Sequence, residues 1–404
     1  MRAVRLFINS LLLLVSASAF GETEDIDSSL NENPNSPLSI EVWSSFQGDL
    51  LDIAAIRFQH ETGNELAIRQ FSSTFELRSE LLIAQLFGTY VPDLVWMPSD
   101  FIGLHDYMGL SPFPNDWVDK TLFEQRSIDS LSLDGQFFGV PLSLGNHLML
   151  YYDKRRVTKP ATSWEALISA SRLMDKPILA ITLNDAYFFN AFFSLYYPTS
   201  PLVSFEFDQQ ATEQTLTFVR SLIELGVIVA DCDHQCGREK LLNGEVDYLI
   251  DGDWALSHLP APYAKSHLAI APTLPTWRDK EMISFSGGKV IAITEVALAE
   301  TSKRDVLRKF IELIQDPVFL SELKREAYHV SAVSSLNNDK HYSALEKAIY
   351  EQYLRAQPMP IDPRLSIGWE SLARTLQRVD EGMPIDQAAF FFEEFFSKYQ
   401  KRLK

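Results

Sequence analysis

The sequence predicts an α/β protein with two domains. Short runs of alternating apolar residues are interleaved with longer runs that have apolar residues at helical spacing, so strands and helices follow one another along the chain. This order is typical of a mainly parallel sheet flanked by helices. The chain has 404 residues, more than a single hydrophobic core usually carries, and 46% of them are apolar.

Strand and helix patterns alternate through the first part of the folded region. Runs with apolar residues at every second position predict strands, and longer runs with apolar residues at helical spacing predict amphipathic helices. Gly63 closes the first helical run and is a typical helix-ending residue. In chain order the segments are 38–43 (strand), 49–63 (helix), 65–71 (strand), 75–88 (helix) and 91–97 (strand).

The pattern changes near residue 135. Two strand-like runs in the segment 135–157 flank a loop at residues 143–147, and a helix-rich half follows. Near the C-terminus, the aromatic stretch FFFEEFF is interpreted as the packing face of an amphipathic helix. The predicted helices are 163–174, 186–197, 211–226, 237–245 and 384–403, and the predicted strands are 246–250, 267–272 and 287–294.

Residues 1–19 have the order of a secretory signal peptide. Two arginines supply the positive start, a short apolar core follows, and Ala-Ser-Ala at residues 17–19 fits the cleavage pattern. The core is short for a membrane span, which needs about 20 apolar residues; a retained N-terminal anchor is the alternative. We expect a mature protein that starts near Phe20 and lies in the periplasm. Residues 20–37, acidic and almost without apolar side chains, are expected to form a flexible linker.

The charge of the chain argues against two classes of partner. The chain has 36 basic and 54 acidic residues, and its net charge at pH 7 is −18. Nucleic acid and anionic lipid both require a basic protein face, so we expect neither as the main partner. The short motifs of phosphate loops, dinucleotide sites, α/β-hydrolase nucleophiles and zinc proteases do not occur in the sequence. We therefore assign no cofactor, no metal and no catalytic residue.

Two cysteines, Cys232 and Cys236, lie close together in the segment DCDHQC. An exported protein meets an oxidising compartment, so a local disulfide is the leading interpretation. A metal site assisted by Asp231 and His234 is the alternative, although no second ligand pair stands at zinc spacing. A ring this short would stabilise the fold by only about 2 kcal/mol. We expect it to pin a loop far from any binding chemistry.

Several segments together resemble the extracellular solute-binding proteins of ABC sugar importers, of the maltodextrin-binding type. No single segment decides the resemblance, but their order and spacing are typical of that family and span nearly all of the mature chain. The segments are IEVWSSFQGDLLDIAAIRFQHETG, VPDLVWMPSD, GQFFGVPLSLGNHLMLYYDKRRV, SWEAL, LLNGEVDYLIDGDWALSHL, SGGKVIAIT and MPIDPRLSIGW.

The resemblance implies a two-lobed periplasmic-binding-protein fold of type II, with a ligand cleft between lobes joined by hinge crossings. The first lobe would hold residues 38–147 and 287–332, and the second lobe residues 148–286 and 333–404. The crossings would be the segments VPLSLGNHLMLYY and SFSGGKVIAIT. The implied function is that a monomeric protein captures a sugar, expected to be an oligosaccharide, and delivers it to an ABC permease in the inner membrane.

Candidate ligand contacts follow from the resemblance and from the chemistry of sugars. A sugar presents hydroxyls on its ring edge and apolar C–H groups on its faces, so its site needs aromatic plates and hydrogen-bonding side chains. Stacking positions of the family correspond to Trp254, Trp369 and Tyr187, and its hydroxyl-accepting carboxylates to Asp185 and Asp100. The other candidates are a glycine pair that lets backbone approach the cleft, three side chains near the first and third strands, and one in the crossing loop: Gly287, Gly288, Phe46, Gln47, Trp96 and Asn146.

Each candidate also has an ordinary structural interpretation. The tryptophans can be core residues, and Tyr187 precedes several phenylalanines that favour core packing. Asp100 and Asp185 stand at turns where an acid commonly caps a helix. Asn146 follows a glycine, as it does in many turns.

Four positions depart from the pattern of the maltodextrin type. Phe46 and Gln47 stand where the resemblance implies an acid and a lysine, Met97 where it implies a tryptophan, and Glu370 where it implies an aromatic residue. A different oligosaccharide or a smaller sugar therefore fits the sequence as well as maltodextrin does.

The segment DYLIDGDWALSHL, residues 247–259, carries the most specific prediction. An apolar run ends at a polar turn, and a helix-like stretch starts with Trp254. We expect Gly252 to permit the turn and the turn to deliver the indole into the cleft. Asp251 or Asp253 is expected to cap the helix that follows.

Two other functions share parts of this pattern. A glycosidase uses two carboxylates across its cleft and has no short local motif, and Asp251 and Asp253 are too close in sequence to be judged as a facing pair. A periplasmic sensor subunit would have the same fold and site but would report to a receptor or kinase. The resemblance favours a binding protein over an enzyme.

Overall fold

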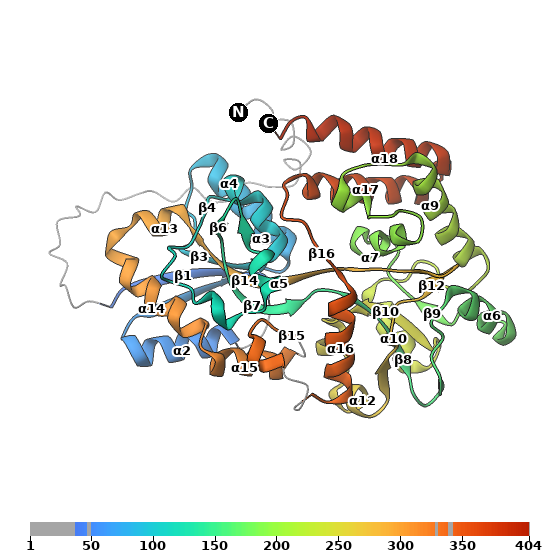
Figure 1. Ribbon diagram of the computed structural model, residues 1–404, viewed down its shortest axis with the longest axis horizontal. Coiled ribbons are helices and arrows are strands. Elements are labelled where there is room, and N and C mark those ends of the chain that lie inside the picture. Colours follow the sequence, from blue (N-terminus) through green and yellow to red (C-terminus); the bar gives the residue numbers. More distant parts are fainter. Residues whose placement is uncertain (1–36, 47–49, 328–329, 338–341, 404) are drawn as a thin grey trace, which may run out of the picture.

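The computed structural model describes residues 37–46, 50–327, 330–337 and 342–403, without the side chains of residues 323–327. The predicted signal peptide (1–19), nearly all of the predicted linker (20–37) and the candidate Gln47 lie outside the described residues. Two lobes lie side by side, and long strands run from one to the other (Figure 1).

A mixed sheet forms the centre of the first lobe. Its strands are β1 Ser39–Ser44, β2 Glu65–Gln70, β3 Leu94–Pro98, β4 Leu110–Ser111, β7 Val140–Gly145, β14 Phe285–Thr294, β15 Val330–Ser331 and β16 Gln357–Pro358, beside a hairpin of β5 Ser132–Leu133 and β6 Gln136–Phe137. The order is β15-β7-β14-β3-β1-β2, and β4 and β16 also pair with β14. β1 is parallel to β2 and β3, as the strand–helix alternation predicts, whereas β14 is antiparallel to β3 and β7.

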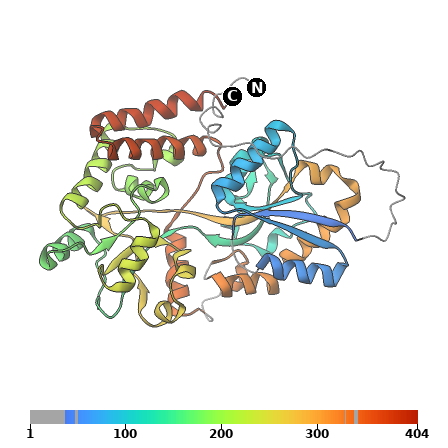
Figure 2. The ribbon, with the colours of Figure 1, turned by 180° about the vertical axis from the view of Figure 1, so that it is seen from behind.

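Helices flank this sheet (Figures 1 and 2). They are α2 Leu50–Thr62, α3 Thr74–Phe87, α4 His105–Met108, α5 Gln125–Asp129, α13 Glu295–Ala299, α14 Arg304–Ile314 and α15 Pro317–Ala327. Gly63 ends α2 with a left-handed φ of 72°, which confirms the predicted stop. The hydroxyl of Ser73 accepts the N–H of Glu76 and caps α3, and Gly88 ends this helix at φ 64°. Both predicted helices are confirmed.

The second lobe holds a smaller sheet in the order β11-β8-β10-β9. Its strands are β8 Leu148–Asp153, β9 Leu179–Ala180, β10 Tyr248–Gly252 and β11 Leu268–Ile270, and a hairpin of β12 Thr276–Trp277 and β13 Lys280–Glu281 lies apart from it. The prediction of a mainly parallel sheet is wrong here, because β8 is antiparallel to β10 and β11, and β9–β10 is the parallel pair. β8 starts at Leu148 opposite Gly252, the last residue of β10, so the chain enters this sheet at the end where β10 stops and runs back along it.

The C-terminal helices complete the molecule. The helices after β8 are α6 Trp164–Met174, α7 Ala186–Asn190, α8 Pro201–Ser204, α9 Gln209–Glu224, α10 His234–Asn243, α11 Ala255–His258, α12 Ala261–Ser266, α16 Ala344–Arg355, α17 Arg364–Asp380 and α18 Ile385–Gln400. α17 and α18 run side by side over the second lobe (Figures 1 and 2), and α18 packs against α9. Phe392 of the FFFEEFF stretch is fully buried and stacks on Phe193 at 5.7 Å, which confirms a packing face. Within the described residues, no helix is both long and apolar enough to cross a membrane.

Two crossings between the lobes position the candidate site. β7 belongs to the first sheet and β8 to the second, and Asn146 turns the chain between them with φ 51°. The ring nitrogen Nε2 of His147 lies 3.1 Å from the carbonyl oxygen of Ile349 in α16, so this helix holds the crossing loop. β14 provides the second crossing: Phe285 pairs with β16 before the strand enters the first sheet. The predicted residue limits of the two lobes stay a prediction.

Candidate ligand-binding site

Three half-buried rings meet on the second lobe, and we call them the aromatic group: Tyr187, Trp254 and Trp369. They come from α7, from the residue before α11 and from α17. The ring centroid of Tyr187 lies 6.0 Å from that of Trp254 and 5.8 Å from that of Trp369. Each of the three residues keeps part of its surface accessible to solvent. The three predicted stacking residues therefore form one aromatic surface.

The backbone at Gly252 allows Trp254 to reach this position. β10 is buried on both faces, and the indole of Trp254 folds back over its last residue, so a Cβ at Gly252 would lie 2.2 Å from indole Cζ3. The glycine provides space for the ring, and its φ is not left-handed. The predicted caps of α11 are wrong: no side chain caps this helix, because Asp251 binds Arg238 at 2.7 Å and the carboxylate of Asp253 accepts the N–H of Asn146 at 3.1 Å.

Tyr187 is fixed at both of its ends. Asp185 Oδ1 accepts its backbone N–H at 2.8 Å, so the helix-cap interpretation of Asp185 is confirmed. The phenol donates to the carbonyl oxygens of Asn146 and, at 3.2 Å, of Phe285, which belong to the two crossings. Burial raises the pKa of the phenol well above its ordinary value. The phenol end of Tyr187 is thus tied to both crossings, and its ring lies against both tryptophans.

The glycine pair in β14 is required by protein contacts. A Cβ at Gly287 would lie 2.5 Å from Cε of Met359, and one at Gly288 would lie 2.8 Å from the carbonyl oxygen of Ser143. The N–H of Gly288 donates to Ser99 Oγ at 3.1 Å. The pair therefore lets β14 lie close to neighbouring segments; a direct approach to ligand stays a prediction.

The first lobe contributes Phe46, whereas Trp96 belongs to its core. The two rings lie 5.4 Å apart, but Trp96 is only 3% exposed, and its buried indole Nε1 has no hydrogen-bond partner among the described residues. Phe46 is half-buried, and Nζ of Lys289 lies 4.6 Å from its ring centroid. Trp96 offers a sugar no open face in this structure, so the core interpretation fits it better.

Asp100 lies in a 3₁₀ helix, η1 (Ser99–Leu104), at the first-lobe side of the site. The helix-cap interpretation is wrong for this residue, because Pro98 precedes η1 and no side chain caps it. Oδ1 of Asp100 is buried, and no described residue forms a hydrogen bond with it. Burial raises the pKa of the carboxyl group to about 6, although its own backbone N–H and Arg78 oppose the rise.

Comparison with known proteins assigns the chain to a family. A family model described as bacterial extracellular solute-binding protein matches residues 54–314. The chain belongs to this family. The maltose/maltodextrin-binding domain MalE from Bdellovibrio bacteriovorus bound to maltotriose has a similar fold, with a TM-score of 0.79 and 21% identity over 90% of this chain and 100% of that chain. The maltose-maltodextrin binding protein of the thermoacidophilic bacterium Alicyclobacillus acidocaldarius gives a TM-score of 0.74 and 21% identity over 89% and 100% of the two chains.

These likenesses confirm the predicted two-lobed type II fold. Family membership places the protein among extracellular binding proteins rather than enzymes. The candidates of this solute-binding protein that the structure brings together come from both lobes and from both crossings. Their contact with a ligand stays a prediction.

The structure adds charged residues that the sequence analysis missed. Lys289 lies beside Phe46; burial lowers the pKa of its ammonium group to about 8, and the charge of Asp253 opposes the fall. Burial also lowers the pKa of Arg78, whereas the nearby Asp100 and Glu370 raise it. Arg78 comes from α3 of the first lobe and Glu370 from α17 of the second, and Glu370 is paired with Arg374 at 2.6 Å. In the sequence, Lys289 directly follows the glycine pair and precedes an apolar run. This position on a predicted crossing strand was the signal that its side chain lies near the site.

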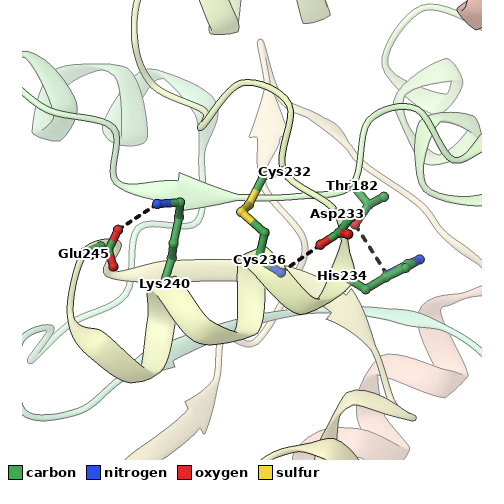
Figure 3. The surroundings of a disulfide bond; sticks show 7 residues. All are labelled: Thr182, Cys232, Asp233, His234, Cys236, Lys240 and Glu245. Atoms are coloured by element: carbon green, nitrogen blue, oxygen red, sulfur yellow. Dashed lines mark hydrogen bonds and ion pairs between the residues drawn. A yellow bond between two sulfur atoms is a disulfide. The ribbon is translucent and has the colours of Figure 1, made fainter.

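The disulfide loop lies beside the site of this solute-binding protein, contrary to the expectation that it is remote. Cys232 and Cys236 are joined, with their sulfur atoms 2.04 Å apart. Between them stands His234, near Thr182 (Figure 3). Its ring lies 4.9 Å from that of Phe188, the neighbour of Tyr187. Among the described residues, no group of three or more potential ligands could hold a metal ion.

Proposed function

We propose that the protein binds a sugar between its lobes, with an oligosaccharide as the expected class, and delivers it to an ABC permease in the inner membrane. The aromatic group carries the proposal, because three adjacent aromatic rings from half-buried residues match the apolar face of a sugar ring. The carboxylate of Asp185 beside them suits the hydroxyls of the ring edge. The maltotriose bound to the structural neighbour supports the same ligand class.

The departures from the maltodextrin pattern shape the expected ligand. Phe46 and Gln47 replace an expected acid and lysine. Lys289, on the second crossing, places its ammonium group over the Phe46 ring and so provides a cation at this end of the site. Glu370 replaces an expected aromatic residue, and its charge raises the pKa of Arg78. We therefore propose a shorter stacking surface with more charged hydrogen-bonding groups at its first-lobe end, which suits a small oligosaccharide.

Export into the periplasm belongs to the same proposal. The order of residues 1–19 and the extracellular family of the chain support it. N-terminal sequencing of periplasmic protein is expected to start near Phe20. An intact Met1 in a membrane pellet would contradict it.

A thermal-shift screen with a sugar panel that includes maltotriose is the first test. A ligand that binds the folded state alone raises the melting temperature. Calorimetry with the sugar that gives the largest shift should then show that Trp254→Ala weakens binding by about 1–3 kcal/mol, the range of a buried aromatic anchor. Trp277→Ala is the matched control, because Trp277 is also half-buried and packs against Phe218 at 4.7 Å, outside the aromatic group.

Three results would contradict the proposal. These are a panel without any shift, equal affinity for wild type and Trp254→Ala, and loss of folding in that variant without ligand. Product analysis after incubation with the same sugars should find them uncleaved, which separates a binding protein from a hydrolase.

A further inference from the structure

The first turn of α10 is held from three sides (Figure 3). Cys232 is only 6% exposed and is joined to Cys236, and the Asp233 carboxylate accepts the backbone N–H of Cys236 at 2.8 Å. Toward the sheet, a Cβ at Gly237 would lie 2.9 Å from a leucine side chain of β10, so the turn sits directly on that strand. His234 is the first residue of α10, and this turn therefore restricts where its imidazole points.

The imidazole of His234 lies among polar groups at the edge of the site. Its Nε2 is 3.5 Å from Asp185 Oδ2, and its Nδ1 is 3.4 Å from Thr182 Oγ1 and 3.9 Å from Asp251 Oδ1. The ring also meets the edge of Phe188. The side chains of His234 and Asp185 are 36% and 38% exposed, so both remain open to solvent where they meet.

Asp251 already has its own partners. Arg238, one helical turn after His234, donates from Nε to Asp251 Oδ2 at 2.7 Å, and the N–H of Gly252 donates to Oδ1 at 2.7 Å. Asp251 is 1% exposed and cannot turn toward solvent. Asp185 is therefore the carboxylate on which His234 can act at the surface of the site.

The two oxygens of Asp185 have different surroundings. Oδ1 caps α7 through the N–H of Tyr187, whereas Oδ2 faces His234 and is open to a ligand hydroxyl. We propose that His234, held by the Cys232–Cys236 loop, is a positioning residue that orients the Asp185 carboxylate for ligand. This inference rests on the proposed function, because it names a second support for a candidate sugar contact.

The same imidazole supports the aromatic group through Phe188. The Phe188 ring lies between His234 and Trp254, with a centroid distance of 6.1 Å to the indole. Loss of the imidazole allows the Asp185 carboxylate to rotate and removes one of the rings that pack against Phe188. Opening of the disulfide acts on His234 indirectly, because it releases the helical turn that holds this residue in place.

Calorimetry with the tightest-binding sugar of the panel tests this proposal. His234→Leu keeps the volume but not the polar contact and should weaken binding about tenfold, whereas His234→Gln keeps a donor and should stay within about threefold of wild type. The double variant Cys232→Ser/Cys236→Ser should weaken binding by about threefold or more. Gln235→Ala is the matched control. Gln235 is an exposed residue of the same turn, and within the described residues its side chain hydrogen-bonds to Glu239 and not to the candidate site.

Two affinity results would overturn the proposal. In one, His234→Leu binds as wild type does. In the other, His234→Gln binds as weakly as His234→Leu, so that ring packing alone accounts for the loss. Melting temperatures of the ligand-free variants show whether a weaker affinity reflects partial unfolding.

Hydrogen exchange without ligand separates a failure of this inference from a failure of the proposed function. If wild type binds no sugar of the panel, the sugar proposal fails. The positioning proposal is then still tested by the hydrogen-exchange rates of the backbone amides of residues 185–190. Their exchange should be faster in His234→Leu and in the double serine variant, but unchanged in His234→Gln and Gln235→Ala. Equal exchange in all variants overturns the positioning role.

Discussion

Asp100 places a carboxyl group between the lobes without a full set of hydrogen bonds. Within the part of the chain that the structure describes, its buried Oδ1 has no hydrogen-bond partner, and burial raises the pKa of the group to about 6. Arg78 lies close enough to oppose this rise but does not cancel it. An ionised Asp100 therefore costs the folded protein stability, which is the usual sign of a group kept for binding rather than for folding.

Asp100→Asn should stabilise the ligand-free protein at pH 8. The pKa of Asp100 is higher in the folded state than in the unfolded state. Below about pH 4 the carboxyl group is protonated in both states, and there the wild type is most stable relative to the variant. As the pH rises through 6, the wild type loses about 1–2 kcal/mol relative to the variant. Urea unfolding of both proteins at pH 4 and pH 8 measures the difference.

The control for this prediction is Asp106→Asn. Asp106 stands on the neighbouring helix α4 with its side chain 83% exposed, and its substitution should change stability by less than about 0.5 kcal/mol at either pH. A difference between wild type and Asp100→Asn that does not depend on pH would contradict the assigned origin of the effect.

At the scale of an element, Asp153 fastens the end of β8 to its surroundings. This residue is fully buried and accepts hydrogen bonds from Arg155 at 2.6 Å, Arg156 at 2.9 Å and the phenol of Tyr263 at 3.1 Å. Burial alone would raise the pKa of Asp153, but the bonds from Arg155 and the charge of Arg156 lower it to about 2. The turn after the first crossing into the second lobe is thereby held in place.

Asp153→Asn should destabilise the second lobe by about 2–4 kcal/mol at pH 7, because the guanidinium groups lose a buried anion. The folded pKa lies below the unfolded value, so the stabilisation is present above about pH 4 and is lost as the pH falls through 2. Urea unfolding of wild type and variant measures this effect. The difference between their midpoints should be larger at pH 7 than at pH 3.

Glu245→Gln is the control for this element. It removes the ion pair with Lys240 on the same lobe, in which the Glu245 side chain is 52% exposed, and should shift stability by less than about 0.5 kcal/mol. If both substitutions have equally small effects, the network around Asp153 does not hold the element.

At the scale of the molecule, the site draws on both lobes and both crossings. Phe46 and Asp100 belong to the first lobe, the aromatic group belongs to the second, and Lys289 lies on the crossing strand β14. A ligand that contacts both halves binds best when they are closed upon it, and so shifts the population toward the closed arrangement. The contact between His147 and α16 places a helix directly against the hinge.

Small-angle scattering should show a smaller radius of gyration at saturating sugar than without it. The reason is that closure brings the two lobes together around the crossings. A sugar of the panel that gives no thermal shift is the control and should leave the radius unchanged. An unchanged radius with the sugar that binds would contradict closure.

The sequence by itself determined the elements and the fold class. Helix ends at Gly63 and Gly88, the alternation of β1 to β3 and the aromatic face of α18 depend on neighbours a few residues apart, which local patterns record. The resemblance then supplied the two-lobed fold and the three rings of the aromatic group. Trp254 follows a polar turn, as the sequence indicates, whereas Trp369 lies inside helix α17 and not after a turn.

Only the tertiary structure decided which candidates share a surface and which groups support them. Asn146 and Asp253 are 107 residues apart, yet they touch; Trp96 stands next to Met97 in sequence, yet both are buried. No local pattern distinguishes such cases, because burial and charge pairing depend on the elements that pack from elsewhere in the chain. For the same reason, the disulfide loop expected to be remote lies beside the site, where folding brings α10 against β10 and α7.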